Sequence, residues 1–164
     1  MIYWCERITE LREASGLGLV DFGATIGQGR EAIRTWCLLH RVPKLSRAWQ
    51  VAASAGRTLD QMIGATPLEG PIVCVRAPRE DVAARWSETI VLLSRSAVSM
   101  RALADLTGQC PATIRNWTRG YRDPTLTTTA EFADALGVPL HDLVAGAVST
   151  PEIADEIIAR KRAR

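Results

Sequence analysis

TGQCPATIRNW, at residues 107–117, has a close counterpart in IGQGREAIRTW at residues 26–36. Glycine, glutamine, isoleucine, arginine and tryptophan recur in the same order, with an offset of 108 − 27 = 81 residues. A glycine followed within a few residues by a helical pattern is typical of two short helices joined by a tight turn. The stretch therefore predicts a helix-turn-helix unit, and the sequence contains it twice.

The repeat extends well beyond these two stretches, and no gap is needed to align it. Chance would not hold one register over such a length, so the sequence predicts two copies of one domain. The same offset of 81 relates the following pairs: Leu11 and Leu92, Ser15 and Ser96, Arg41 and Arg122, Pro43 and Pro124, Leu45 and Leu126, Ala52 and Ala133, Gly56 and Gly137, and Leu59 and Leu140.

Each copy is expected to consist of five short helices. In the first copy, the apolar periodicity and the glycine stops predict helices over about 8–15, 19–26, 30–38, 45–55 and 59–63. In the second copy a helix is expected over about 80–95. Ser99 is a good N-cap for the next helix, which should end at Gly108, and Pro111 should be the first residue of the helix after that. Leu126 to Leu136 should form the helix that follows the Asp123-Pro124 turn.

The expected fold class is all-α, with two tandem five-helix domains at residues 1–64 and 80–146. A short Pro-containing linker occupies residues 65–79, and an amphipathic helix with a basic tail occupies residues 147–164. The β-branched run at residues 72–75 leaves three alternatives: an isolated strand, pairing with a second chain, or an extended path over the domain surface. The C-terminal helix could pack on the second copy, dimerise or touch the DNA backbone.

The cysteines and histidines do not predict a metal site. None of the four cysteines (Cys5, Cys37, Cys74 and Cys110) forms a CxxC pair, and the chain has only two histidines. Zinc ligands are usually spaced in such pairs, so we expect reduced, packed thiols instead. No apolar run is long enough to cross a bilayer, and the first residues lack the pattern of a signal peptide. These features predict a cytoplasmic, nucleoid-associated protein.

The sequence does not predict an enzyme. It contains no nucleophile–base constellation and no set of metal ligands. Gly27-Gln28-Gly29 lies between two expected helices rather than after a strand, so it is not a dinucleotide-binding motif. No cofactor and no small-molecule substrate is expected.

The basic residues are concentrated in two segments, although the net charge is only +2. Residues 28–47 hold five arginines and lysines against the single acid Glu31, and residues 109–122 hold three arginines and no acid. Local basic patches in a nearly neutral chain are the pattern expected of a surface that faces phosphates.

The second copy carries the motifs LTG at 106–108, IRNWTRG at 114–120, DPTL at 123–126 and ALGVPL at 135–140. In these motifs the chain resembles the Cro/CI-type (λ-repressor-like) helix-turn-helix family. The resemblance covers about residues 5–64 and 86–146, and it is more specific in the second copy. It implies a regulator that binds double-stranded DNA sequence-specifically, such as a repressor of phage, prophage or plasmid type.

In this family the third helix of each domain enters the major groove and its first residues meet base edges. Arg30 would bind guanine, Glu31 would accept from cytosine, and Asn116 would bind adenine. The buried side of the same helices should hold Ile33, Trp36, Ile114 and Trp117. The resemblance places base contacts on Gln28, Arg30, Glu31, Thr35, Gln109, Ala112, Thr113 and Asn116. It places backbone contacts on Arg34, Arg41, Lys44, Ser46, Arg47, Arg115, Arg119, Tyr121, Arg122 and Thr127.

The chain departs from the family pattern in ways that keep two hypotheses open. Leu19 and Met100 stand where the family often has a phosphate-binding glutamine, and Leu38-Leu39 replaces the Arg-Gly that follows the tryptophan. One hypothesis is a monomer that reads a bipartite, non-palindromic operator with half-sites about 34 Å apart, although a homodimer is possible. The other is an adaptor or antitoxin in which only the second copy binds DNA and the first docks a protein.

Overall fold

The fold was analysed in a computed structural model, which describes residues 2–38, 41–95, 99–147, 155 and 159. Within these residues the fold is all-α, with ten helices and no strand, as the sequence predicts. The chain divides into two compact units. Unit 1 comprises residues 1–80 with 125–127, and unit 2 comprises residues 81–124 with 128–164. The helix predicted for 147–164 falls almost entirely outside the described residues.

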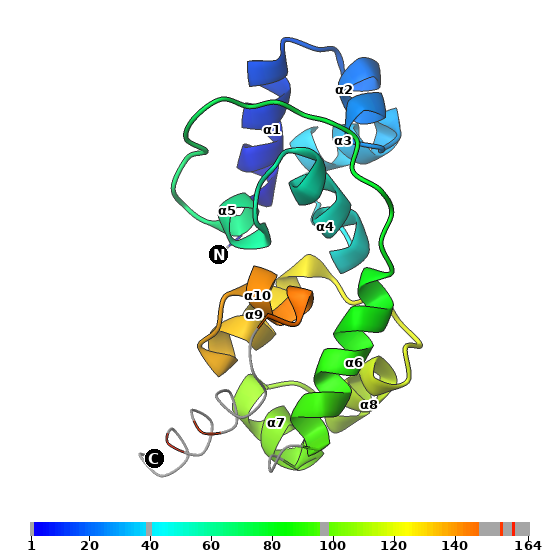
Figure 1. Ribbon diagram of the computed structural model, residues 1–164, viewed down its shortest axis with the longest axis vertical. Helices are drawn as coiled ribbons and strands as arrows, with labels where there is room; N and C mark the ends of the chain where they lie inside the picture. The colour runs from blue at the N-terminus through cyan, green and yellow to red at the C-terminus, as the bar shows by residue number, and fades with distance from the viewer. Residues whose placement is uncertain (1, 39–40, 96–98, 148–154, 156–158, 160–164) are drawn as a thin grey trace. The chain divides into compact units, whose positions relative to one another are not determined.

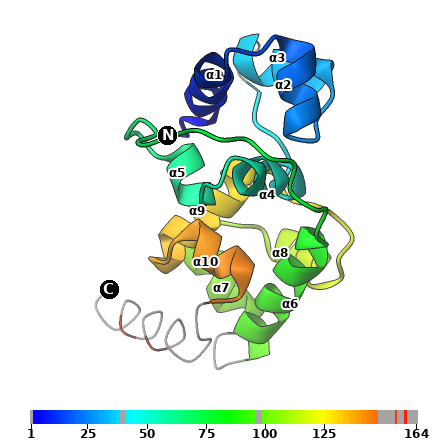
Figure 2. The ribbon, with the colours of Figure 1, turned by 45° about the horizontal axis from the view of Figure 1, so that its top comes forward.

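Unit 1 contains the first five helices (Figure 1). Helix α1 packs against α2, α3 and α5, and α2 packs against α3. Figures 1 and 2 both show α2 and α3 side by side. The indole rings of Trp4 and Trp36 meet edge to face with centroids 5.7 Å apart, which joins α1 to α3 in the core. The helices are α1 (Trp4–Ser15), α2 (Leu19–Thr25), α3 (Arg30–Leu38), α4 (Leu45–Ser54) and α5 (Leu59–Ile63).

Unit 2 contains the other five helices. Helix α8 packs against α6 and α7, and α10 packs against α6. Its core is an aromatic cluster in which the rings of Trp86, Trp117 and Phe132 lie edge to face, with centroids 5.5 to 5.7 Å apart. As predicted, the Ser99 hydroxyl caps α7 by accepting the Ala102 N–H at 3.2 Å. The helices are α6 (Val82–Arg95), α7 (Met100–Thr107), α8 (Pro111–Thr118), α9 (Leu126–Leu136) and α10 (Leu140–Ala145).

The buried positions of the two units correspond, but not with one offset throughout. From α2 onward the buried residues keep the offset of 81, whereas the first helices are related by 82. The predicted pairing of Leu11 with Leu92 is therefore wrong: Leu11 is fully buried, Leu92 is 53% exposed, and Leu93 is 1% exposed. From the last buried leucine of the first helix to the first buried residue of the second, unit 2 thus has one position fewer, with Leu93 and Leu103 10 apart (103 − 93) where Leu11 and Phe22 are 11 apart (22 − 11). Pairs with an offset of 82 are Trp4 and Trp86, Ile8 and Ile90, and Leu11 and Leu93; pairs with 81 include Phe22 and Leu103, Ile33 and Ile114, Trp36 and Trp117, and Leu45 and Leu126.

Two helix starts also differ from the predicted ones. Helix α1 begins at Trp4 rather than near residue 8, because Trp4 and Cys5 are themselves buried against the rest of unit 1. Helix α6 begins at Val82, after Asp81, whose carboxylate accepts the Ala84 N–H at 3.0 Å. The aspartate thus satisfies one of the free N–H groups of the first turn. The predicted start at about residue 80 did not take this capping role of Asp81 into account.

The segment predicted as a linker lies extended along unit 1 and forms no strand (Figures 1 and 2). The Val75 N–H donates to the Ser54 carbonyl at 2.7 Å, and the Ala77 N–H donates to the Ser54 hydroxyl at 2.9 Å. The Arg57 guanidinium donates to the Pro71 carbonyl at 3.2 Å. Of the three alternatives for the β-branched run, the extended path over the domain surface is the one observed.

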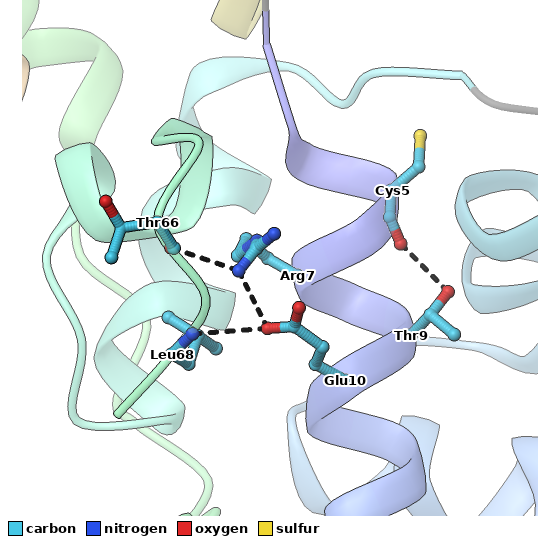
Figure 3. A network of polar contacts seen from close by, with 6 residues as sticks. All are labelled: Cys5, Arg7, Thr9, Glu10, Thr66 and Leu68. Atoms are coloured by element: carbon cyan, nitrogen blue, oxygen red, sulfur yellow. Dashed lines mark hydrogen bonds and ion pairs between the residues drawn. The ribbon is translucent and has the colours of Figure 1, made fainter. Parts of the chain in front are cut away.

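A buried arginine anchors the start of this segment to α1 (Figure 3). Arg7 is only 4% exposed and donates to the Glu10 carboxylate at 2.9 Å and to the Thr66 carbonyl at 3.0 Å. The same carboxylate oxygen accepts the Leu68 N–H at 3.2 Å. Burying a guanidinium is costly unless its charge and its donors are matched. Here Glu10 on α1 and the Thr66 carbonyl both accept from Nη1, whereas the buried Nε has no hydrogen-bond partner among the described residues.

Candidate nucleic-acid interface

Helix α3 has one buried and one exposed side. Ile33 is fully buried and Trp36 is 3% exposed, which confirms their prediction as core residues. Arg30, Glu31 and Arg34 are exposed on the remaining surface of the helix. Because the buried pair fixes the rotation of the helix, the three charged side chains face solvent together.

The polar groups on this exposed side also contact one another. Arg34 lies 3.5 Å from the Glu31 carboxylate, and both side chains are largely exposed. An exposed pair of this kind contributes little to stability and separates easily. The Thr35 hydroxyl donates to the Glu31 carbonyl at 2.6 Å, so Thr35 is turned toward its own helix. Glu31 and Arg34 thus remain accessible to a ligand, and the Thr35 hydroxyl is already engaged.

Gln28, another predicted base contact, is directed toward α4. Its Nε2 donates to Gln50 Oε1 at 2.9 Å, and Gln50 is only 8% exposed. The Gln28 main-chain N–H donates to the Gly23 carbonyl at 2.7 Å, which closes the turn between α2 and α3. Gln28 is therefore held by two bonds directly before α3, and no sequence pattern indicated its partner on α4.

This turn is tighter in unit 1 than its counterpart in unit 2. A Cβ on Gly23 would lie 2.7 Å from the Gln28 carbonyl oxygen, closer than real side chains approach. The residue 81 positions later is Ala104, and there the equivalent bond, from the Gln109 N–H to the Ala104 carbonyl, is 3.1 Å rather than 2.7 Å. The glycine thus allows the chain to approach α2 more closely in unit 1.

Helix α8 repeats the division seen in α3. Ile114 is fully buried and Trp117 is 3% exposed, again as predicted. Among the predicted base contacts of unit 2, Ala112 is exposed, whereas Gln109, Thr113 and Asn116 are partly exposed. The Asn116 carbonyl accepts the Tyr121 N–H at 3.1 Å, which folds the following loop back onto the end of the helix.

The predicted backbone contacts are mostly exposed cations near these helices. Tyr121 is 69% exposed, and the Arg119 guanidinium lies over its ring, 5.8 Å from the centroid. A cation held on an aromatic face in this way loses less freedom when it meets a phosphate. Exposed positions are Arg34, Arg41, Lys44, Arg47, Arg115, Arg119, Tyr121 and Arg122, whereas Ser46 and Thr127 are partly exposed.

At two exposed positions unit 1 has an apolar side chain where unit 2 has a cation. Val20 is 60% exposed and Leu38 is 61% exposed in unit 1. At the same positions, 81 residues later, unit 2 has the exposed cations Arg101 and Arg119. The sequence comparison identified the change at Leu38, but it missed Val20, which the same offset could have revealed.

The thiols do not form a site of their own. Cys110 is exposed, contrary to the prediction of packed thiols, whereas Cys5 is buried. Burial raises the pKa of Cys5 and of Cys74 above the ordinary value of 9.0, so both stay protonated at neutral pH. Among the described residues, no group of histidine, cysteine and acidic side chains could hold a metal ion.

A protein-family model described as helix-turn-helix matches residues 95–143. The matched stretch contains α7, α8 and α9 and, apart from residues 125–127, belongs to unit 2. Members of this family bind double-stranded DNA and regulate transcription, and they are usually not enzymes. No curated protein and no solved structure matches the chain. In the described part of the chain, every helix is too short or too polar to span a membrane.

Proposed function

We propose that this protein is a transcription regulator, of the repressor type, that binds double-stranded DNA sequence-specifically. The observation that carries the proposal is the exposed surface of α8 and the loop after it. Arg115, Arg119 and Arg122 are all exposed there, and residues 109–122 contain no acid to offset them. This surface lies within the stretch that the helix-turn-helix family model matches.

In unit 2, side chains along α8 would read bases while the cations hold the phosphates. The Asn116 amide can bind adenine bidentately, and the methyl groups of Ala112 and Thr113 can contact thymine. A good bidentate pair contributes about 1–3 kcal/mol of discrimination against the wrong base. Contacts from Arg119, Tyr121 and Arg122 would position the protein without carrying sequence information.

Unit 1 would read a second half-site with a different helix. Arg30 offers a guanidinium for guanine and Glu31 an acceptor for cytosine, whereas the matching positions of α8 are Pro111 and Ala112. A chain with two unlike readers does not need a palindrome. We therefore propose that one chain recognises a bipartite, non-palindromic operator with half-sites about 34 Å apart.

A second candidate function rests on Val20 and Leu38. Large exposed apolar side chains flanking a reading helix are unusual on a surface that meets phosphates, and they suit a protein partner better. In this alternative, unit 2 alone binds DNA and unit 1 docks a protein, as in an adaptor or an antitoxin.

The experiment selects bound sites from a random DNA pool and then measures affinity for the enriched sequence. We expect Asn116→Ala to relax the preference at one base pair, and Arg30→Glu to weaken binding far more than Arg79→Glu does. Arg79 is exposed in the extended segment, and its reversal changes the net charge by the same amount. If Asn116→Ala relaxes the base preference but Arg30→Glu and Arg79→Glu weaken binding equally, the docking function is favoured for unit 1. If no DNA sequence is enriched from the pool, both candidate functions are excluded.

A further inference from the structure

Arg76, in the segment between α5 and α6, lies beside the turn that leads into α3. A Cβ on Gly27 would lie 3.4 Å from Arg76 Nε and 2.9 Å from Gln50 Nε2. Gly27 has a φ of +70°, and only Gln28 and Gly29 separate it from Arg30, the first residue of α3. A cation 49 residues away in the sequence (76 − 27) is thus brought to the predicted reading end of unit 1.

The main chain on both sides of Arg76 is fixed to α4. The N–H groups of Val75 and Ala77 donate to the carbonyl and the hydroxyl of Ser54, at 2.7 and 2.9 Å. These bonds hold the arginine backbone in place before any ligand arrives. Preorganisation of this kind reduces the conformational entropy lost on binding.

The Arg76 guanidinium is available to an anion. The residue is exposed, and within the described residues it makes no ion pair and no hydrogen bond. A Cβ at position 27 would crowd Gln50 Nε2 at 2.9 Å but would meet Arg76 Nε at 3.4 Å, an ordinary van der Waals distance, so the guanidinium lies directly against this turn. An unpaired guanidinium presents a planar set of donors that matches the oxygens of a phosphate.

We propose that Arg76 contacts a DNA phosphate next to the base pairs that α3 reads. This contact would give unit 1 a cation at the start of α3, whereas at the end of α3 Leu38 stands where unit 2 has Arg119. The inference rests on the proposed function, since it requires α3 to lie against DNA. It makes the extended segment part of the DNA-binding surface of unit 1 rather than only a connection.

The test uses the full chain and the selected DNA, with affinity measured by fluorescence anisotropy between about 50 and 200 mM salt. Arg76→Ala should reduce the slope of log affinity against log salt by about 0.9, the value for one phosphate contact. Arg79→Ala is the matched control, because Arg79 is also exposed and lies three residues further along the same segment (79 − 76). Arg79→Ala should leave the slope unchanged. Arg76→Lys, which keeps the positive charge, should have a slope close to that of the parent.

Arg30→Ala is measured in parallel, so that failure of the inference and failure of the proposed function can be distinguished. If Arg30→Ala weakens binding and Arg76→Ala leaves the slope unchanged, Arg76 is not a contact although α3 is a reader. If Arg76→Ala and Arg79→Ala change the slope equally, a diffuse charge effect replaces the proposed contact. If neither Arg30→Ala nor Arg76→Ala has an effect while Asn116→Ala does, unit 1 does not meet DNA. The Arg76 contact and the bipartite operator then both fall, whereas DNA binding by unit 2 stands. Melting temperatures within a few degrees of the parent exclude unfolding as the cause.

Discussion

The side-chain amide of Gln28 donates to that of Gln50 across 2.9 Å, and this bond joins the turn before α3 to a nearly buried position on α4. The two residues are 22 positions apart in the sequence. The core residues of α3 mainly set its rotation and depth, but the position of its first residues depends on this turn. A hydrogen bond that fixes the turn therefore also fixes where a base-reading side chain begins.

We expect Gln28 and Gln50 to be energetically coupled. Replacing each with leucine, singly and together, should give a coupling free energy of about 1 kcal/mol in urea unfolding, the net contribution of one partly buried hydrogen bond. Gln109 and Glu131 occupy the same two positions in unit 2 and serve as the control pair. Equal coupling in the two pairs would show that the bond contributes nothing specific to unit 1.

Gly23→Ala should lower the melting temperature, although alanine favours helices more than glycine does. The new Cβ would lie 2.7 Å from the Gln28 carbonyl oxygen, and relieving that overlap should cost about 1–3 kcal/mol. The reverse change, Ala104→Gly, removes a methyl group that is only 3% exposed and should cost about 1–2 kcal/mol through lower helix propensity and lost apolar burial. A Gly23→Ala variant more stable than the parent would contradict the tight turn.

Leu93→Ala should destabilise unit 2 far more than Leu92→Ala. Leu93 is 1% exposed and its truncation leaves a cavity, for which about 2–5 kcal/mol is typical. Leu92 is 53% exposed, so its loss should stay within about 0.5 kcal/mol. Denaturant unfolding of both variants decides between the two registers, because a uniform offset of 81 would give the larger loss at Leu92.

Arg7→Met should loosen the start of the extended segment while keeping most of the buried packing. The Thr66 carbonyl loses its donor, the Arg7 guanidinium, and Glu10, which accepts the Leu68 N–H, loses the cation that holds its carboxylate. We expect a loss of about 1–3 kcal/mol and faster hydrogen exchange at the Leu68 amide, which donates to Glu10. Arg12→Met, which breaks a more exposed pair with Glu13, is the control. Unchanged exchange at Leu68 would mean that Arg7 does not anchor the segment.

Local signals in the sequence predicted α3, α7 and α8 closely, because glycine, proline and a capping serine mark their ends. They predicted α1 less well, since Tyr3 makes no side-chain cap and the helix begins inside an apolar run. The contacts of Gln28 and Arg76 could not be predicted. Each contact depends on where a distant segment packs. The periodic pattern of apolar residues, which predicts the helices, carries no information about such contacts.

The shift from 82 to 81 residues between the units also restricts recombination. A crossover inside the first helix, at positions matched by the offset of 81, would join two half-helices whose apolar faces differ by one residue, or about 100° around the axis. Such a hybrid would turn Leu92 inward or Trp86 outward. Exchanges matched by the offset of 81 therefore keep the apolar faces in register only after the first helix.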